Sequence, residues 1–271
     1  MTTEKIYLKE GNEKVNLVTY ISDDSTGMMP KPRPAMIVIP GGAYMFLADR
    51  EGEPVVKKFF AEGFNCFLLN YSIAPNAAFP EPLREISLAI IHIKENAEKY
   101  NVDPERVYVC GFSAGGHLAA SIGTMWHQDK AKPYEDMPYG LNKPRGMVLC
   151  YPWITLDEHY RNNECALNVS GGEITEEKIQ TLSAEKQVSD KTVPAYIWTT
   201  GADDCVDVMN TFLMAEAMAK NNIPYELHIF QGGRHGMVLA NHETSYGGEP
   251  VLESKDVATW IDEAITWCKN N

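Results

Sequence analysis

The chain is poor in basic residues and lacks the signals of export. Its 271 residues include 24 Lys and Arg against 37 Asp and Glu, a formal charge of −13. This balance repels a phosphate backbone or an anionic membrane surface, so we expect neither nucleic acid nor a membrane as a partner. The amino-terminal segment 1–14 is charged and polar where a secretory signal needs an apolar core of about ten residues, which predicts a cytoplasmic location.

Metal-binding, redox and multidomain patterns are also missing. The six cysteines lie far apart with no CxxC pair, so we expect free, buried thiols. His228, His235 and His242 are regularly spaced, but they fall on a predicted strand and two loops, which do not make one ligand-bearing face. We therefore expect no metal. The chain has no internal repeat, low-complexity tract or linker, which predicts a single domain over residues 1–271.

The chain does contain a regular alternation of apolar strands and amphipathic helices. Its 44% hydrophobic content can bury a large core. Alternating apolar and polar residues on both sides of Gly11-Asn12 predict an antiparallel hairpin at a sheet edge. Strands are then expected at 35–40, 65–73, 107–111, 146–152, 194–201 and 225–231, and helices at 54–62, 82–100, 114–126, 208–222 and near the end of the chain.

This alternation predicts an α/β fold, with a mostly parallel central sheet, helices on both faces and a ligand site at the carboxyl ends of the strands. The segment 155–192 is polar and long for a loop inside a compact domain. Loops of this length are usually lids or binding elements, so we expect a small lid insertion there. A solvated excursion is the alternative.

A G-x-S-x-G motif, Gly111 to Gly115, lies between a predicted strand and a predicted helix. A sharp turn at this position strains the backbone of Ser113, and the bare glycines let strand and helix approach each other. The serine hydroxyl is then held at the sheet edge. Since the motif alone arises by chance in about one chain in ten, the other groups that a serine nucleophile needs must also be present.

A base and an orienting acid follow in the expected order of serine, acid and histidine. His235 lies in a glycine-rich loop after the last predicted strand, where it can serve as the general base. Asp203, Asp204 and Asp207 lie in the turn after the preceding strand. One of them is expected to orient the histidine, and capping of the next helix explains at least one of the others.

The turn after the first central strand offers donors for an oxyanion. Gly42 and Ala43 can direct backbone N–H groups toward a reacting carbonyl, together with the N–H of Ala114. A plain turn is the alternative. Three residues that follow the elements of the site are candidates either for the substrate pocket or for the core: Tyr44, Trp153 and Met237.

With these residues in place, the chain resembles the α/β-hydrolase esterases and lipases, especially the small bacterial carbohydrate esterases of the hormone-sensitive-lipase-like group. The likeness runs from about 35 to 267 and is carried by "PGGAY", "NYSIAP", "FPEPLREI", "NVDPERVYVCGFSAGGHLAA" and "VDVMNTFLMAEAMAKNNIPYELHIFQGGRHG". Registering Val206-Asp207-Val208 on the family's Val-Pro-Val implies Asp203 as the orienting acid. Pro40 stands where many relatives have His, and Asp207 replaces the usual Pro.

The resemblance implies a carboxylester hydrolase that needs no cofactor or metal. Ser113 would attack an ester carbonyl and His235 would take its proton. We expect small acyl esters as substrates, acetyl first, on a soluble alcohol such as a plant-derived oligosaccharide. Two alternatives stay open at this point: an amide-cleaving serine hydrolase such as a kynurenine formamidase, and a catalytically silent binding protein of the same fold.

Overall fold

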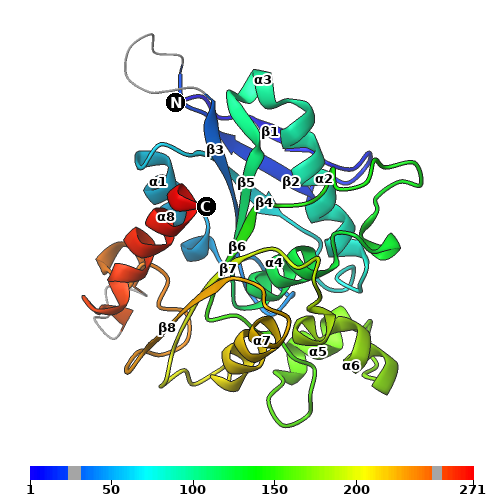
Figure 1. Ribbon diagram of the computed structural model, residues 1–271, viewed down its shortest axis with the longest axis vertical. Helices are drawn as coiled ribbons and strands as arrows, with labels where there is room; N and C mark the ends of the chain where they lie inside the picture. The colour runs from blue at the N-terminus through cyan, green and yellow to red at the C-terminus, as the bar shows by residue number, and fades with distance from the viewer. Residues whose placement is uncertain (24–31, 246–251) are drawn as a thin grey trace.

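The central element of the molecule is one sheet of eight strands (Figure 1). The computed structural model describes residues 1–23, 32–245 and 252–271. The strands lie in the order β1-β2-β4-β3-β5-β6-β7-β8. Their bounds are Lys5–Tyr7 (β1), Asn16–Tyr20 (β2), Arg33–Ile39 (β3), Asn65–Asn70 (β4), Val102–Phe112 (β5), Gly146–Cys150 (β6), Ala195–Thr200 (β7) and Tyr225–Phe230 (β8).

The six strands from β3 to β8 run parallel to one another, so their carboxyl ends meet at one edge of the sheet. The hairpin of β1 and β2 is antiparallel and occupies one side of the sheet, as its sequence predicts. β2 is also antiparallel to β4. The mostly parallel α/β sheet expected from the sequence is therefore confirmed.

Helices cover both faces of the sheet, and strand side chains alternate between two apolar layers. Ile37 and Val109 belong to the layer under α2, α4 and α7, whereas Val38 and Cys110 belong to the layer under α1 and α8. The helix bounds are Glu53–Ala61 (α1), Glu81–Glu95 (α2), Ala97–Tyr100 (α3), Ser113–Met125 (α4), Asn163–Val169 (α5), Glu176–Leu182 (α6), Met209–Lys220 (α7) and Trp260–Asn270 (α8).

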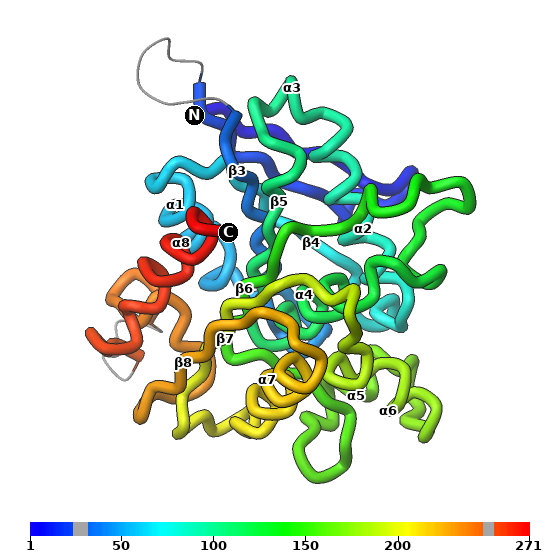
Figure 2. The backbone as a smooth tube through the Cα atoms, in the orientation of Figure 1, coloured from blue at the N-terminus to red at the C-terminus, as the bar shows by residue number. Residues whose placement is uncertain are grey.

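Helices from opposite ends of the chain share the second layer. In Figure 2 the red tube of α8 runs beside the blue-cyan tube of α1. Val56 and Phe59 of α1 and Trp260 of α8 belong to the same buried cluster. Lys269 forms an ion pair of 2.9 Å with Glu62 at the end of α1. α1 and α8 therefore cover the same face of the sheet.

Most predicted strands and helices shift by one to three residues at an end, and two elements differ more strongly. The expected helix over 82–100 is divided at Asn96, whose side chain donates to the carbonyl of His92 and so caps α2. The strand expected from 107 starts at Val102, because Arg33 pairs with this residue in the neighbouring strand. Both differences come from hydrogen bonds that periodicity does not encode.

The segment 155–192, here called the lid segment, is more ordered than its sequence suggests. It contains α5, α6 and the short 3₁₀ helix Ala184–Gln187. Asn162 and Thr175 cap the two α-helices by accepting the N–H groups of Cys165 and Lys178. Short helices gain little from propensity alone, so these caps and the burial of Cys165, Val169 and Leu182 in the apolar layer stabilise α5 and α6.

Candidate active site

Ser113 lies on a sharp turn between β5 and α4, with a backbone φ of 52°. A side chain at Gly111 would place its Cβ 2.1 Å from the Gly115 carbonyl oxygen, and one at Gly115 would lie 2.2 Å from the Ile39 carbonyl oxygen. Both glycines are therefore required for the helix to start this close to the sheet. The left-handed conformation holds the Ser113 hydroxyl at the carboxyl edge of the strands.

The loop after β8 brings His235 to this hydroxyl. The distance from His235 Nε2 to Ser113 Oγ is 2.8 Å, although the residues are 122 positions apart. Gly233 and Gly236, with φ of 128° and 77°, let the loop turn back over the sheet edge. The imidazole is 17% exposed and the serine 8%, so the pair is sheltered but reachable.

Asp203 lies on the far side of the imidazole. Its Oδ2 is 2.7 Å from His235 Nδ1, and its side chain is only 1% exposed. Its other oxygen accepts the N–H groups of Cys205 and Val206. Because a carboxylate only accepts, Nδ1 carries the proton, and Nε2 is left free to accept the hydroxyl of Ser113.

The two neighbouring aspartates lie in different environments. Asp204 accepts the backbone N–H of His235 at 3.1 Å and the guanidinium of Arg234 at 2.7 Å. These bonds lower its carboxyl pKa, the first more than the second. Asp207 accepts the N–H of Met209 in the first turn of α7. Only Asp203 contacts the imidazole ring, which separates three residues that their local sequence left equivalent.

The turn after β3 faces the same hydroxyl. Gly42 and Ala43 have φ of 120° and 54° and line the cavity that contains Ser113. Within the described part of the chain, the N–H groups of both residues lack a protein acceptor. Ala114 is the second residue of α4, where helical N–H groups also lack helical partners. Two of the predicted oxyanion donors, Gly42 and Ala43, thus line the cavity, and the third, Ala114, directly follows Ser113.

Glu51 is a buried carboxylate of this site that the sequence analysis missed. It is 4% exposed, accepts the N–H of Gly41 at 2.7 Å and accepts the hydroxyl of Tyr151 at 2.8 Å. Burial raises its pKa, while the Gly41 and Tyr151 bonds and the nearby His235 act against this rise. The Tyr151 ring also packs edge-on against His235, with 5.0 Å between ring centroids. Nothing in the local sequence indicates that this one of several glutamates turns inward.

Its neighbour Arg50 binds a different loop. The Arg50 guanidinium donates to the carbonyl of Gly236 at 3.2 Å and to that of Thr244. Consecutive residues of the short 3₁₀ helix Asp49–Glu51 therefore hold the loop after β3 on one side and the loop that carries His235 on the other. This link fixes two loops whose relative position decides the geometry at Ser113.

The cavity in front of Ser113 has a volume of about 300 Å³. The lid segment contributes one wall, and the loops after β3, β7 and β8 contribute the others. Its lining residues are Gly42, Ala43, Phe46, Ala48, Arg50, Glu51, Ser113, Asn162, Glu164, Cys165, Cys205, Val206, His235 and Gly236. Phe46 is 52% exposed and Glu164 is exposed, so both an aromatic face and a carboxylate face the opening.

The three side chains considered for the substrate pocket lie in the core instead. Tyr44, Trp153 and Met237 are at most 1% exposed and do not line this cavity. The Tyr44 hydroxyl bonds to His117 Nδ1 at 2.8 Å, and Trp153 packs on the same imidazole at 4.6 Å. Both aromatic rings therefore face the core. Tyr44, Trp153 and Met237 are all core residues and not part of the cavity lining.

His117 itself joins the nucleophile helix to the lid segment. Its Nε2 lies 2.8 Å from the carbonyl of Leu182 at the end of α6. Since a carbonyl only accepts, Nε2 carries the proton and Nδ1 accepts the Tyr44 hydroxyl. Burial lowers the His117 pKa to about 4, and the neutral ring links α4 to the loop after β3 and to the lid segment.

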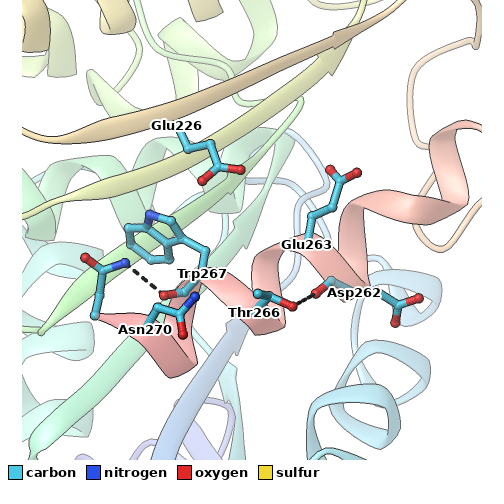
Figure 3. A pocket seen from close by; sticks show the side chains of 7 residues that line it. Glu226, Asp262, Glu263, Thr266, Trp267 and Asn270 are labelled. Carbon is cyan, nitrogen blue, oxygen red and sulfur yellow. Dashed lines mark hydrogen bonds between the residues drawn. The ribbon is translucent and has the colours of Figure 1, made fainter.

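A second hollow, between β8 and α8, lacks the groups of this chemistry. Figure 3 shows Glu226 on its strand facing Glu263 of the helix, with Asp262, Thr266 and Trp267 around them. Glu226 is near the amino end of β8, at the sheet edge opposite Ser113. Among residues 1–23, 32–245 and 252–271, no three His, Cys, Asp or Glu side chains group as metal ligands. No helix in these ranges combines the length and apolarity that crossing a bilayer requires.

A mostly parallel sheet covered on both faces, with a serine at positive φ between strand and helix, defines the α/β-hydrolase class of esterases and lipases. Within that class, the BD-FAE family model matches residues 26–218, and the chain belongs to this family.

Three relatives are similar to much of the chain. Endo-1,4-beta-xylanase B of Butyrivibrio fibrisolvens is 35% identical over 84% of this chain and 35% of its own length. Acetylxylan esterase of Xylanibacter ruminicola is 28% identical over 87% of this chain and 46% of its own. A solved acetyl ester-xyloside bifunctional hydrolase of Caldicellulosiruptor lactoaceticus is 33% identical, with a TM-score of 0.81 over 98% and 96% of the two chains. This chain therefore spans between a third and a half of the length of the xylanase and of the acetylxylan esterase.

Proposed function

We propose that the protein is a serine carboxylester hydrolase with Ser113 as nucleophile, His235 as general base and Asp203 as the acid that orients it. The observation that carries this proposal is the chain of two short contacts, 2.8 Å from Ser113 to His235 and 2.7 Å from His235 to Asp203. The order of the three residues along the chain is that of α/β hydrolases.

In the first half-reaction the Ser113 oxygen attacks the ester carbonyl while its proton passes to His235 Nε2. The N–H groups of Gly42, Ala43 and Ala114 stabilise the oxyanion of the tetrahedral intermediate. The intermediate collapses with loss of the alcohol, which takes the proton from His235. Water then attacks the acyl-serine, His235 takes the proton of the water and returns one to Ser113, and the carboxylic acid leaves. The carboxylate of Asp203 stabilises the imidazolium at both stages.

Acetyl esters of a carbohydrate are the proposed substrates. The cavity of about 300 Å³ in front of Ser113 suits a small acyl group. Of the relatives, one is named an acetylxylan esterase, one an acetyl ester-xyloside bifunctional hydrolase and one an endo-1,4-beta-xylanase. The alcohol portion is therefore proposed to be a sugar hydroxyl.

The nucleophile can be tested with a fluorophosphonate probe. We expect covalent labelling of the protein to be lost in Ser113→Ala, with kcat/KM for p-nitrophenyl acetate falling by about 10⁴-fold or more. Ser121→Ala is the matched control, because Ser121 lies on the same helix and its buried hydroxyl lacks a hydrogen-bond partner among the described residues. Labelling that persists in Ser113→Ala would refute the assignment.

The acyl preference can be tested with esters of increasing chain length. We expect p-nitrophenyl acetate to be cleaved faster than p-nitrophenyl octanoate, and acetate to be released from acetylated xylo- or manno-oligosaccharides. A clear preference for the octanoate would contradict the small-acyl proposal. Faster cleavage of N-formylkynurenine than of aryl acetate would favour amide chemistry instead.

A further inference from the structure

A second groove lies beside the active-site cavity and shares one of its walls. We call it the edge groove; its volume is about 460 Å³. Phe46 lines both this groove and the cavity that contains Ser113. The full lining is Asn12, Lys14, Val15, Phe46, Leu47, Asn70, Tyr71, Ser72, Ile73, Ala74, Pro75 and Asn76.

The topology of the sheet places the edge groove on the same side as Ser113. Ser113 follows the carboxyl end of β5, and Asn70 is the last residue of β4 in the parallel part of the sheet. β2 is antiparallel to β4, and its first residue, Asn16, pairs with Asn70. The turn that precedes β2 therefore reaches the carboxyl edge of the sheet. A substrate bound at Ser113 can extend past Phe46 onto this surface.

The edge groove combines apolar walls with polar groups that have no protein partner. The ammonium of Lys14 and the side-chain amide of Asn76 are exposed and bond to nothing within residues 1–23, 32–245 and 252–271. The amide nitrogen of Asn70 donates to Asn16, which leaves the Asn70 carbonyl oxygen free. Val15 is buried, and Phe46 presents a 52% exposed ring.

This mixture fits a sugar better than an alkyl chain. Pyranose rings have apolar C–H faces that pack on aromatic and aliphatic side chains, and hydroxyl edges that both donate and accept hydrogen bonds. An alkyl chain in the groove would cover Lys14, Asn70 and Asn76 without replacing their bonds to water, which is costly for each polar group. Pockets that combine apolar walls with a few polar groups of this kind are typical of specific small-molecule binding.

We propose that the edge groove binds the alcohol portion of the substrate, namely the sugar units of an oligosaccharide beyond the one that carries the ester. This inference rests on the proposed esterase function and assigns the groove a separate role. Phe46 lies between the sugar unit that carries the ester and the sugar units that follow it. Lys14, Asn70 and Asn76 then bond to hydroxyl groups of the distal units.

The test compares the double variant Lys14→Ala/Asn76→Ala with the wild type on two substrates, an acetylated tetrasaccharide and p-nitrophenyl acetate. We expect the ratio of kcat/KM for the tetrasaccharide to that for the aryl ester to fall about 5- to 20-fold, mainly through KM, as one or two hydrogen bonds are lost. Lys58→Ala is the matched control, since Lys58 is an exposed lysine on α1 that pairs with no described residue and does not line the edge groove. Its ratio should stay at the wild-type value.

A second measurement does not depend on turnover of an acetylated sugar. Unacetylated xylotetraose and mannotetraose should inhibit hydrolysis of p-nitrophenyl acetate competitively, and the better inhibitor should bind more weakly to the double variant. If neither sugar inhibits and the substrate ratio is unchanged, the edge-groove proposal is wrong while the esterase proposal stands. If the double variant instead loses activity on p-nitrophenyl decanoate, the groove holds an acyl chain and the proposal is also overturned. An inactive wild type on every ester would refute the proposed function itself.

Discussion

At the scale of single residues, the three aspartates after β7 show what the fold adds to a local sequence. Asp203, Asp204 and Asp207 lie within five positions, yet one contacts the imidazole of His235, one contacts its backbone and one holds the start of α7. The roles of Asp203 and Asp204 arise from a loop about thirty residues further along the chain, whereas that of Asp207 is local. The resemblance to carbohydrate esterases implied Asp203, whereas the residues alone did not.

We expect Asp203→Asn to lower kcat for p-nitrophenyl acetate by about 10³- to 10⁴-fold, because the amide favours the wrong imidazole tautomer and cannot stabilise the imidazolium. Asp204→Asn serves as the matched control. It removes a carboxylate from the same turn without touching the ring, so we expect a loss of no more than about 10-fold. Equal losses in the two variants would contradict the assignment. Steady-state kinetics of both purified variants provide the measurement.

Glu51 is expected to be a positioning residue. It holds the Gly41 N–H and thus the loop that carries the proposed oxyanion donors. In Glu51→Leu the buried Gly41 N–H loses its acceptor, so the loop shifts, and we expect kcat to fall about 10- to 100-fold with little change in KM. Tyr151→Phe removes only the hydroxyl that bonds Glu51 and leaves the Gly41 bond, so its effect should be smaller.

The comparison of these two variants decides between a positioning role and a merely structural one. A structural role predicts similar losses of stability and no separation of kcat from KM. A positioning role predicts that kcat depends on the Gly41 bond, even when thermal denaturation shows that both variants are folded at the assay temperature. Losses of kcat that are equal in the two variants would contradict the role given to Glu51.

At the scale of elements, the contact between α4 and the lid segment depends on one neutral histidine. His117 is fully buried, and its Nε2–H donates to the carbonyl at the end of α6. Its pKa in the folded protein is about 4, below the ordinary value near 6.5 that applies when the chain is unfolded. As the pH falls from about 6.5 to about 4, the unfolded chain gains a proton that the folded protein does not, so folding stability is lost in this window.

We expect His117→Gln to remove this part of the pH dependence. The loss of unfolding free energy between pH 7 and pH 4 should be about 3 kcal/mol smaller in the variant than in the wild type. Urea denaturation at both pH values measures the difference. Because the comparison is made within each protein, a lower stability of the variant at pH 7 does not affect it. Parallel losses in the two proteins would show that His117 does not titrate on unfolding.

Element prediction failed where short helices depend on tertiary contacts. The lid segment has no long apolar periodicity, so α5 and α6 are not visible as amphipathic helices in the sequence. A weaker signal was present, since Asn162 and Thr175 are good capping residues, each followed by a glutamate in the first turn. β3, β6 and α4 were predicted closely because each is rich in apolar residues and carries a glycine or proline at or beside one end.

At the scale of the whole molecule, both apolar layers depend on the same strands. Neighbouring residues of β3, β5, β6 and β7 alternate between the two layers, so neither layer persists without the sheet. The sequence predicts one domain over residues 1–271, and this architecture supports that proposal. Strand order decides where each functional residue lies along the carboxyl edge of the sheet. The sequence alone does not specify this order; it indicates it only through the alternation of strands and helices and through the family resemblance.

We therefore expect one cooperative unfolding transition in urea. Trp126 and Trp153 belong to one layer, and Trp198 and Trp260 to the other, so tryptophan fluorescence reports on both. The midpoint of the fluorescence transition should coincide with that of far-ultraviolet circular dichroism and with the loss of esterase activity. Two separated fluorescence transitions would contradict a single domain and would indicate that one layer unfolds first.

The hairpin turn that precedes β2 lines the edge groove but contributes no residue of the proposed triad. A Cβ at Gly11 would meet nothing within 4 Å, so the tip of this turn projects into open space. Insertions or deletions there would leave the nucleophile, base and acid, which lie at 113, 203 and 235, in their framework. If the edge groove binds distal sugars, changes confined to this turn can alter which oligosaccharides are recognised while the proposed catalytic residues stay the same.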